Sequence, residues 1–240
     1  MITIIPLTWR RFSSTPAYGD CRIRVFPRTA GKQMRYPPDH KERTRQKVLD
    51  LAAADLCVNG IERTGIAEIM QSAGLTHGGF YAHFASKDEM VAAAITQMFG
   101  RLTGKLETGM QHLGPAKTLD LFINSYLSTK HRDNPAQGCP IAALAGEVQR
   151  QPASTKHAYS VALQRYLRTI AALLPLENGE AQTDLAASLL MEMVGALLLA
   201  RCVTDNHASE RVLEGAKHSV EMRFGGHQRV TPGSRVEIPG

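Results

Sequence analysis

Two histidines and a tyrosine stand close together in the sequence, at His77, Tyr81 and His83. Such side chains can transfer protons in an enzyme or donate hydrogen bonds to phosphate. Catalysis would also need a nucleophile paired with a base, an HExxH metal site, a glycine-rich phosphate loop or a CxxC pair, and the sequence has none of these at motif spacing. We therefore interpret Tyr81 and His83 as phosphate contacts and predict that the chain is not an enzyme and uses no cofactor or metal.

These residues lie in the stretch 66–87, which predicts two short helices joined by a tight turn and the start of a third helix. Apolar residues recur at helical spacing in the first helix, at Ile66, Ile69, Met70 and Ala73. Gly74 can supply the backbone conformation that ends a helix. Thr76 is suited to cap the second helix, and Phe80 and Phe84 are spaced to pin it to the first.

The second helix carries Gly78 and Gly79 in its first turn, where each glycine costs roughly 1 kcal/mol relative to alanine. A helix that only packs would gain from alanine at both positions. Glycine at an exposed helix start is favoured where the backbone approaches a partner closely. One buried face and one thin, polar face are what a helix in the DNA major groove requires.

The segment 73–87, with the letters AGLTHGGFYAHFASK, resembles the DNA-binding signature of the tetracycline-repressor (TetR) family. Gly65 departs from the usual Ser or Thr at the first cap, and Met70 replaces a small Ala. The resemblance implies base contacts from His77, Gly79, Tyr81 and Ala82, and phosphate contacts from Thr76, Tyr81, His83 and Lys87. With the basic cluster in the preceding helix, the predicted DNA-binding residues are Arg43, Arg45, Thr76, His77, Gly78, Gly79, Tyr81, Ala82, His83 and Lys87.

Length, composition and charge divide the 240-residue chain unevenly. The net charge is +6, but residues 1–33 hold six basic residues and one acidic residue, so the remaining 22 basic and 21 acidic residues nearly balance. One interpretation of residues 1–33 is a basic arm that adds phosphate contacts. The other is a disordered extension or a start codon placed too far upstream, and we favour this second interpretation. We predict a helix-turn-helix domain at 34–86, a helical effector-binding and dimerisation domain at 87–224, and a loose tail at 225–240.

Strand signals are sparse and helical periodicity recurs to the end of the chain, which predicts an all-α fold. The expected helices are about nine, a number that also resembles the family. Those with predicted bounds outside the short pair above are 41–59, 87–108, 116–132, 141–149, 152–174, 180–203 and 209–224. The apolar run Leu185–Ala200 is 16 residues long and contains Glu192, so we expect no membrane span and a cytoplasmic protein.

The most apolar predicted helix, at 180–203, has more apolar surface than one chain can easily cover. We therefore expect a homodimer through the last two helices, which would read a palindromic operator in double-stranded DNA. By resemblance the helical body holds a small apolar or aromatic effector that releases a repressor from its operator. The candidate pocket residues are Phe99, Leu102, Phe122, Tyr126, Tyr159, Tyr166 and Met193, each of which could instead be plain core.

Two alternatives stay open at this stage. The helical body could belong to an enzyme or carrier that binds a small molecule and has no DNA role, although such a protein has no use for the glycine-thinned face at Thr76–Lys87. Cys139 could sense redox state, although a single cysteine is more often a small buried hydrophobic residue. The four cysteines show no paired spacing, which favours neither a zinc site nor disulfides.

Overall fold

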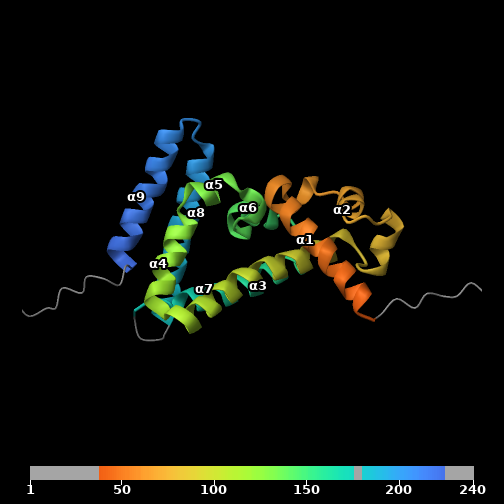
Figure 1. Cartoon of the computed structure of the whole chain (residues 1–240), viewed down its shortest axis with the longest axis horizontal. Helices are drawn as coiled ribbons and strands as arrows, with labels where there is room; N and C mark the ends of the chain where they lie inside the picture. The colour runs from red at the N-terminus through yellow and green to blue at the C-terminus, as the bar shows by residue number, and fades with distance from the viewer. Residues whose placement is uncertain (1–37, 176–179, 225–240) are drawn as a thin grey trace, which may run out of the picture. The chain divides into compact units, whose positions relative to one another are not determined.

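The computed structural model describes residues 38–175 and 180–224. Within these ranges the chain forms nine α-helices, two short 3-10 helices and no strand (Figure 1), so the all-α prediction is confirmed. The predicted basic extension at 1–33 and the tail at 225–240 lie outside the described residues.

Most helices agree with the sequence-based bounds to within a few residues. In chain order they are α1 (Pro38–Arg63), α2 (Ile66–Ser72), η1 (His77–Ala82), α3 (Lys87–Leu113), α4 (Pro115–Tyr126), α5 (Thr129–Asp133), η2 (Pro135–Gln137), α6 (Pro140–Val148), α7 (Ala153–Ala171), α8 (Glu180–Cys202) and α9 (Asn206–Phe224).

The first helix is interrupted where the sequence predicted its end. Gly60 has φ 79° and ψ 177°, a conformation that a side chain disfavours, and a further helical turn at 61–63 follows it. The helix predicted after Thr76 is a 3-10 helix rather than an α-helix, with His83 N–H donating to Phe80 O at 2.9 Å. Two glycines in six residues explain this difference, because they weaken the propensity for an α-helix.

The long helix α3 begins at a predicted cap and links the short helices to the rest of the chain. The Ser86 hydroxyl accepts from the N–H of Glu89 at 3.1 Å, and the Glu89 carboxylate accepts from the N–H of Ala85 at 2.7 Å. The helix continues to Leu113, beyond the predicted end near Thr108, and Gly114 then stops it with φ 80°. It packs against α1, α4 and α7 (Figure 1).

The prediction of a single helix over 116–132 is wrong, because the helix ends at Tyr126 and a second, short helix follows. Leu127 leaves the helical conformation, with φ −88° and ψ 63°. Ser128 then starts α5, and its hydroxyl accepts from the N–H of His131 at 3.2 Å. The break matters for function because it places the α4–α5 junction at one end of a pocket described below.

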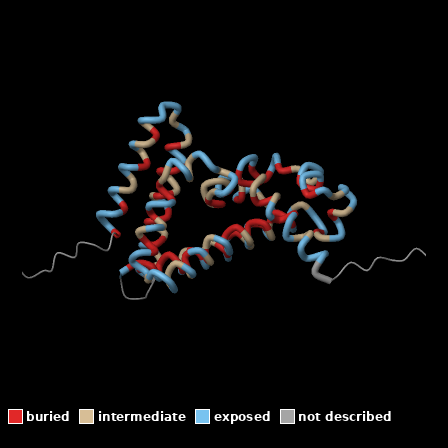
Figure 2. The backbone as a smooth tube through the Cα atoms, viewed as in Figure 1, coloured by how far each residue is buried: buried red, intermediate tan, exposed pale blue. Residues whose placement is uncertain are grey.

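Buried side chains run along the facing sides of α1, α3 and α7 and continue into α8 (Figure 2). Helix α8 packs against α7 and α9. Its segment 181–202, with a mean hydropathy of 1.7, has the length and composition of a membrane-crossing helix, which core helices of soluble proteins share. The helix is thus longer than the 16-residue apolar run on which the expectation of no membrane span rested.

Candidate nucleic-acid interface

The short helix η1 is held by two phenylalanines on its inner side. Phe80 and Phe84 are both at least 98% buried, and their ring centroids lie 5.4 Å apart. They pack in the core that Ile69 and Met70 of α2 enter, as predicted. Burial of one such ring contributes about 1.5–3 kcal/mol, so the pair fixes which face of η1 remains outside.

The outer face of η1 is polar, small and exposed. Tyr81 is 62% exposed, and His77, Gly78 and Ala82 are exposed beside it. Thr76 occupies the predicted cap position, but its hydroxyl makes no capping hydrogen bond, contrary to expectation. The fold thus leaves this hydroxyl available on the same outer face.

The two glycines of η1 differ in their surroundings. A Cβ added to Gly78 would meet nothing within 4 Å, and neither Gly78 nor Gly79 has a positive φ. A Cβ on Gly79 would lie 3.6 Å from the Met70 methyl, which is an ordinary contact that turns this residue toward α2. The fold itself therefore does not require glycine at Gly78.

Cations from α1 flank the helix at His83. The Arg45 guanidinium lies 4.8 Å from the centre of the Phe84 ring, a cation–π contact that orients it beside η1. Desolvation by burial lowers the pKa of His83, and the charges of Lys41 and Arg45 lower that pKa further. His83 is therefore neutral near pH 7, and its buried Nδ1 has no hydrogen-bond partner among the described residues.

The remaining predicted DNA-binding residues lie around the same face. Arg43 is exposed on α1. Lys87, half-buried at the start of α3, donates to Glu62 O at 3.3 Å, so its ammonium also ties α3 to the end of α1. Sequence reasoning did not select Lys41, which lies near His83, because basic residues are common on exposed helix faces.

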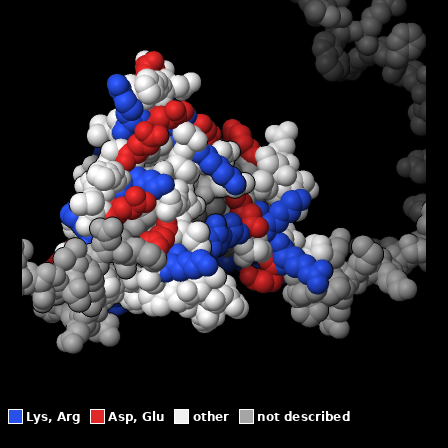
Figure 3. Space-filling model, turned by 60° about the vertical axis from the view of Figure 1, so that its left-hand side comes forward, with Lys and Arg blue, Asp and Glu red and all other residues white. Residues whose placement is uncertain are grey.

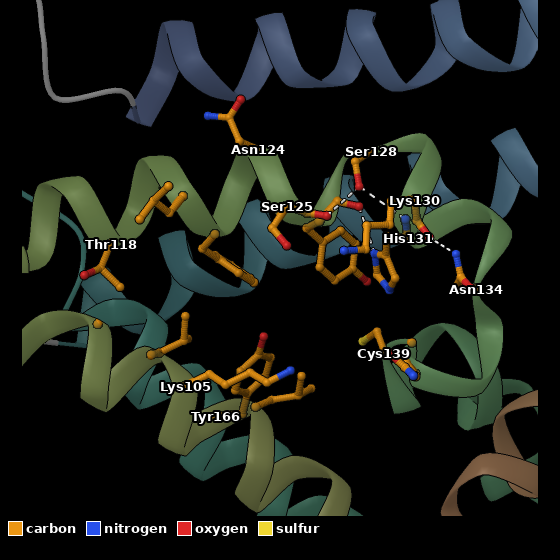
Figure 4. Close-up of a pocket in the computed structure, with 18 of the residues that line it drawn as sticks. Lys105, Thr118, Asn124, Ser125, Ser128, Lys130, His131, Asn134, Cys139 and Tyr166 are labelled. Atoms are coloured by element: carbon orange, nitrogen blue, oxygen red, sulfur yellow. Dashed lines mark hydrogen bonds between the residues drawn. The ribbon is translucent and has the colours of Figure 1, made fainter.

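A pocket of about 610 Å³ lies between α3, α4, the α4–α5 junction and α7 (Figure 4). Four of the seven predicted pocket residues line it, namely Leu102, Phe122, Tyr126 and Tyr166. The other three do not, because Phe99, Tyr159 and Met193 pack in the core, with the Phe99 and Tyr159 rings edge to face at 5.4 Å.

The pocket is more polar than the sequence predicted. Its lining includes Lys105, Lys130, His131 and several Ser, Asn and Gln side chains. Helical periodicity gave no signal for these residues, because each occupies a position that the pattern assigns to the surface.

Acidic and basic side chains are interspersed over the face that comes forward in Figure 3, so no single-sign patch marks this side of the molecule.

Cys139 also lines the pocket, at the start of α6, and is 2% exposed. Burial raises the pKa of its thiol, so the reactive thiolate is disfavoured at neutral pH. This favours the interpretation of Cys139 as a buried, unreactive side chain over that of a redox sensor.

The helix-turn-helix segment is similar to known proteins. Residues 48–94 match the family model described as bacterial regulatory proteins, tetR family. The repressor KstR2 of Mycolicibacterium smegmatis is 32% identical over 99 residues, covering 40% of this chain and 47% of that protein. The regulator AcrR of Shigella flexneri is 31% identical over 81 residues, covering 34% of this chain and 37% of that protein. The chain therefore spans about half, or less, of the length of these relatives.

Solved structures share the fold over a larger part of the chain. A TetR transcriptional regulator from Legionella pneumophila has a TM-score of 0.65 at 20% identity, over 75% of this chain and 97% of that one. The reduced form of NemR from E. coli has a TM-score of 0.63 at 20% identity, over 75% of this chain and 97% of that one. At this identity the likeness establishes the fold alone.

Proposed function

We propose that the chain belongs to the tetR family of bacterial regulatory proteins, which the match at 48–94 supports, and that it is a sequence-specific DNA-binding transcriptional regulator. It acts as a repressor in the cytoplasm, and a small effector bound in the helical body releases it from a palindromic operator. Residues 34–86 form the DNA-binding domain and residues 87–224 the effector-binding and dimerisation domain. The relatives that match are regulators, which supports a binding protein rather than an enzyme.

The outer face of η1 is the observation that carries this proposal. Phe80 and Phe84 fix the inner side, while His77, Tyr81 and Ala82 stand exposed on a helix that Gly78 keeps thin. A thin polar face of this kind fits the major groove, where base edges present donors and acceptors. His77, Tyr81 and Ala82 are therefore the proposed base-reading residues, whereas Gly79 lies on the side of η1 that faces Met70 of α2.

Phosphate contacts come from the groups around that face. Arg45, Lys87 and the hydroxyls of Thr76 and Tyr81 surround it, and His83 adds an imidazole at its edge. Such contacts fix the protein on the duplex without reading its sequence. Arg43 extends the same basic surface along α1.

A homodimer through α8 and α9 completes the proposal. Apolar side chains remain exposed on these two helices, with Met191 68%, Leu199 62% and Met222 75% exposed. Exposed apolar surface on two adjacent helices is typical of a four-helix dimer interface. A two-fold dimer would present two copies of η1 to half-sites separated by about 34–36 Å or a multiple of that distance.

Mobility shifts on the DNA upstream of the protein's own gene test DNA binding. Tyr81→Ala and Lys87→Ala should each weaken binding, since each removes a proposed phosphate contact. Tyr159→Phe, a change within the core of the helical body, serves as a matched control and should bind as the unmodified protein does. Unchanged affinity in both test variants would refute the assigned interface.

A further inference from the structure

The polar end of the pocket lies at the α4–α5 junction, where most hydrogen-bonding groups already have partners. The Ser128 hydroxyl donates to Ser125 O at 2.8 Å and accepts from the N–H of His131 at 3.2 Å. The Asn134 side-chain amide donates to Lys130 O at 2.8 Å. These groups shape the pocket wall (Figure 4), but they are not free to select a ligand.

The hydrogen bonding of His131 shows which of its two ring nitrogens carries the proton. Its Nδ1 lies 2.8 Å from Tyr126 O, and a carbonyl oxygen only accepts, so Nδ1 carries the proton. Burial lowers the pKa of His131, which keeps the ring neutral and leaves Nε2 as an acceptor beside Gly138. One acceptor atom in the pocket wall does not by itself define the class of ligand. The hydrogen-bond donors of the pocket define it more closely.

The Tyr126 hydroxyl has no oxygen or nitrogen partner. The residue is 6% exposed and lines the pocket, and among the described residues only the thiol of Cys139, a weak hydrogen-bonding group, interacts with its hydroxyl. Burial raises the pKa of Tyr126 well above its ordinary value, so the proton stays on the oxygen at neutral pH. A buried donor left in this state favours any ligand that brings an acceptor to it.

Lys105 supplies a second donor and a positive charge. It extends from α3 into the pocket, toward the end where Tyr166 and Cys139 lie (Figure 4). Within the described part of the chain Lys105 makes no ion pair, and the pocket lining contains neither Asp nor Glu. Behind the wall, the Arg201 guanidinium donates to the carbonyls of His131 and Arg132 at 3.0 and 3.1 Å, and its charge adds to the positive potential.

The pocket also has apolar walls. Their residues are Leu102, Leu106 and Leu113 of α3 and Leu121 and Phe122 of α4, and the Phe122 ring lies 5.9 Å from the Tyr126 ring and 6.4 Å from the Tyr166 ring. A volume of about 610 Å³ falls within the range of roughly 300–1,000 Å³ that small-molecule sites occupy. The pocket therefore combines donors and positive charge with hydrocarbon walls.

We propose that this pocket binds an amphipathic organic anion, whose carboxylate accepts from Lys105 and the Tyr126 hydroxyl and whose apolar body lies between α3 and α4. The inference rests on the proposed function only in making this anion the effector. It replaces the purely apolar or aromatic effector expected from the sequence, because such a ligand brings no acceptor to the buried Tyr126 hydroxyl and no negative charge to the exposed Lys105 ammonium.

Calorimetric titration of the full chain without DNA tests the ligand class directly. The probes are decanoate and phenylacetate, each compared with its uncharged primary amide. The probe whose apolar body fits between α3 and α4 should bind at least about ten-fold more tightly as the carboxylate than as the amide, since a charged acceptor strengthens each hydrogen bond. Lys105→Met should abolish that difference, and Tyr126→Phe should reduce it.

Lys117→Met is the matched control, because Lys117 is exposed on α4 and does not line the pocket. It should keep the preference for the carboxylate. Equal binding of acid and amide, failure of both acids to bind, or an unchanged preference in Lys105→Met would overturn the proposal. Repeating the titration with operator DNA separates the two claims, since an acid that binds tightly without releasing DNA would refute the effector role and leave the ligand class intact.

Discussion

Glu147 of α6 offers a sharp test of how the helical body holds the DNA-binding helices. Its carboxylate Oε2 accepts from the backbone N–H of Ile61 at 2.9 Å and of Glu62 at 3.1 Å. These amides belong to the turn that follows the break at Gly60, and the carboxylate occupies the space where a Gly60 Cβ would lie. The residue therefore caps a helical turn in α1 from a different part of the fold.

Removal of this carboxylate in Glu147→Ala leaves two backbone donors without that partner. Side-chain caps contribute about 0.5–2 kcal/mol, and hydrogen bonds to charged groups about 1.5–3 kcal/mol. Because Glu62 is exposed and water can replace part of the loss, we expect about 2 kcal/mol in the free energy of unfolding. For a chain of this size that corresponds to a decrease in Tm of about 4–8 °C.

Thermal unfolding followed by circular dichroism measures this change. Glu147→Gln keeps an acceptor oxygen but loses the charge, so its Tm should lie between those of Glu147→Ala and the unmodified protein. Glu214→Ala removes an exposed carboxylate on α9 and should leave Tm within error. If Glu147→Ala unfolds at the same temperature as Glu214→Ala, the cap contributes nothing and the reasoning is wrong.

Four further predictions follow from individual contacts. Phe80→Ala should destabilise the chain by about 3–5 kcal/mol in urea denaturation and abolish operator binding, because the inner side of η1 loses its anchor. Gly195→Glu should convert the proposed dimer to a monomer in light scattering with little loss of helical content, since a Cβ there meets nothing within 4 Å of the chain itself. The free energy of unfolding should fall as pH drops below about 6.5. Burial lowers the pKa of His131, so the unfolded chain takes up a proton there that the folded chain excludes. This pH dependence should be weaker in His131→Asn. A chain starting at Met34 should keep operator affinity and salt dependence, whereas a functional basic arm would make both fall on deletion.

The sequence predicted the short helices between Ile66 and Lys87 well because their signals are local. Gly74 has a positive φ, as expected for a glycine that ends a helix. Phe80 and Phe84 are both buried, as their spacing of four residues predicted. Ser86 and Glu89 form the hydrogen bonds that their spacing indicated. Each of these features depends on residues a few positions apart, so periodicity and capping rules suffice to find them.

The pocket and the Glu147 cap could not be predicted in the same way. Lys105 and Glu147 occupy helix positions that periodicity assigns to solvent, and their roles depend on which distant helix lies opposite. The break after Tyr126 was missed because apolar spacing continues through it, although Ser128 carried a capping signal. Phe99 and Tyr159 were expected at the pocket, but burial alone does not distinguish a pocket wall from the core behind it.

Selection of binding sites from a random duplex library tests the central claim most directly. The full chain should enrich one palindromic sequence. His77→Ala should change the preferred bases within each half-site, and Arg45→Ala should weaken binding to all sequences without changing the preference. Failure to enrich any sequence, or the same preferred bases in His77→Ala at unchanged affinity, would contradict recognition of DNA by η1.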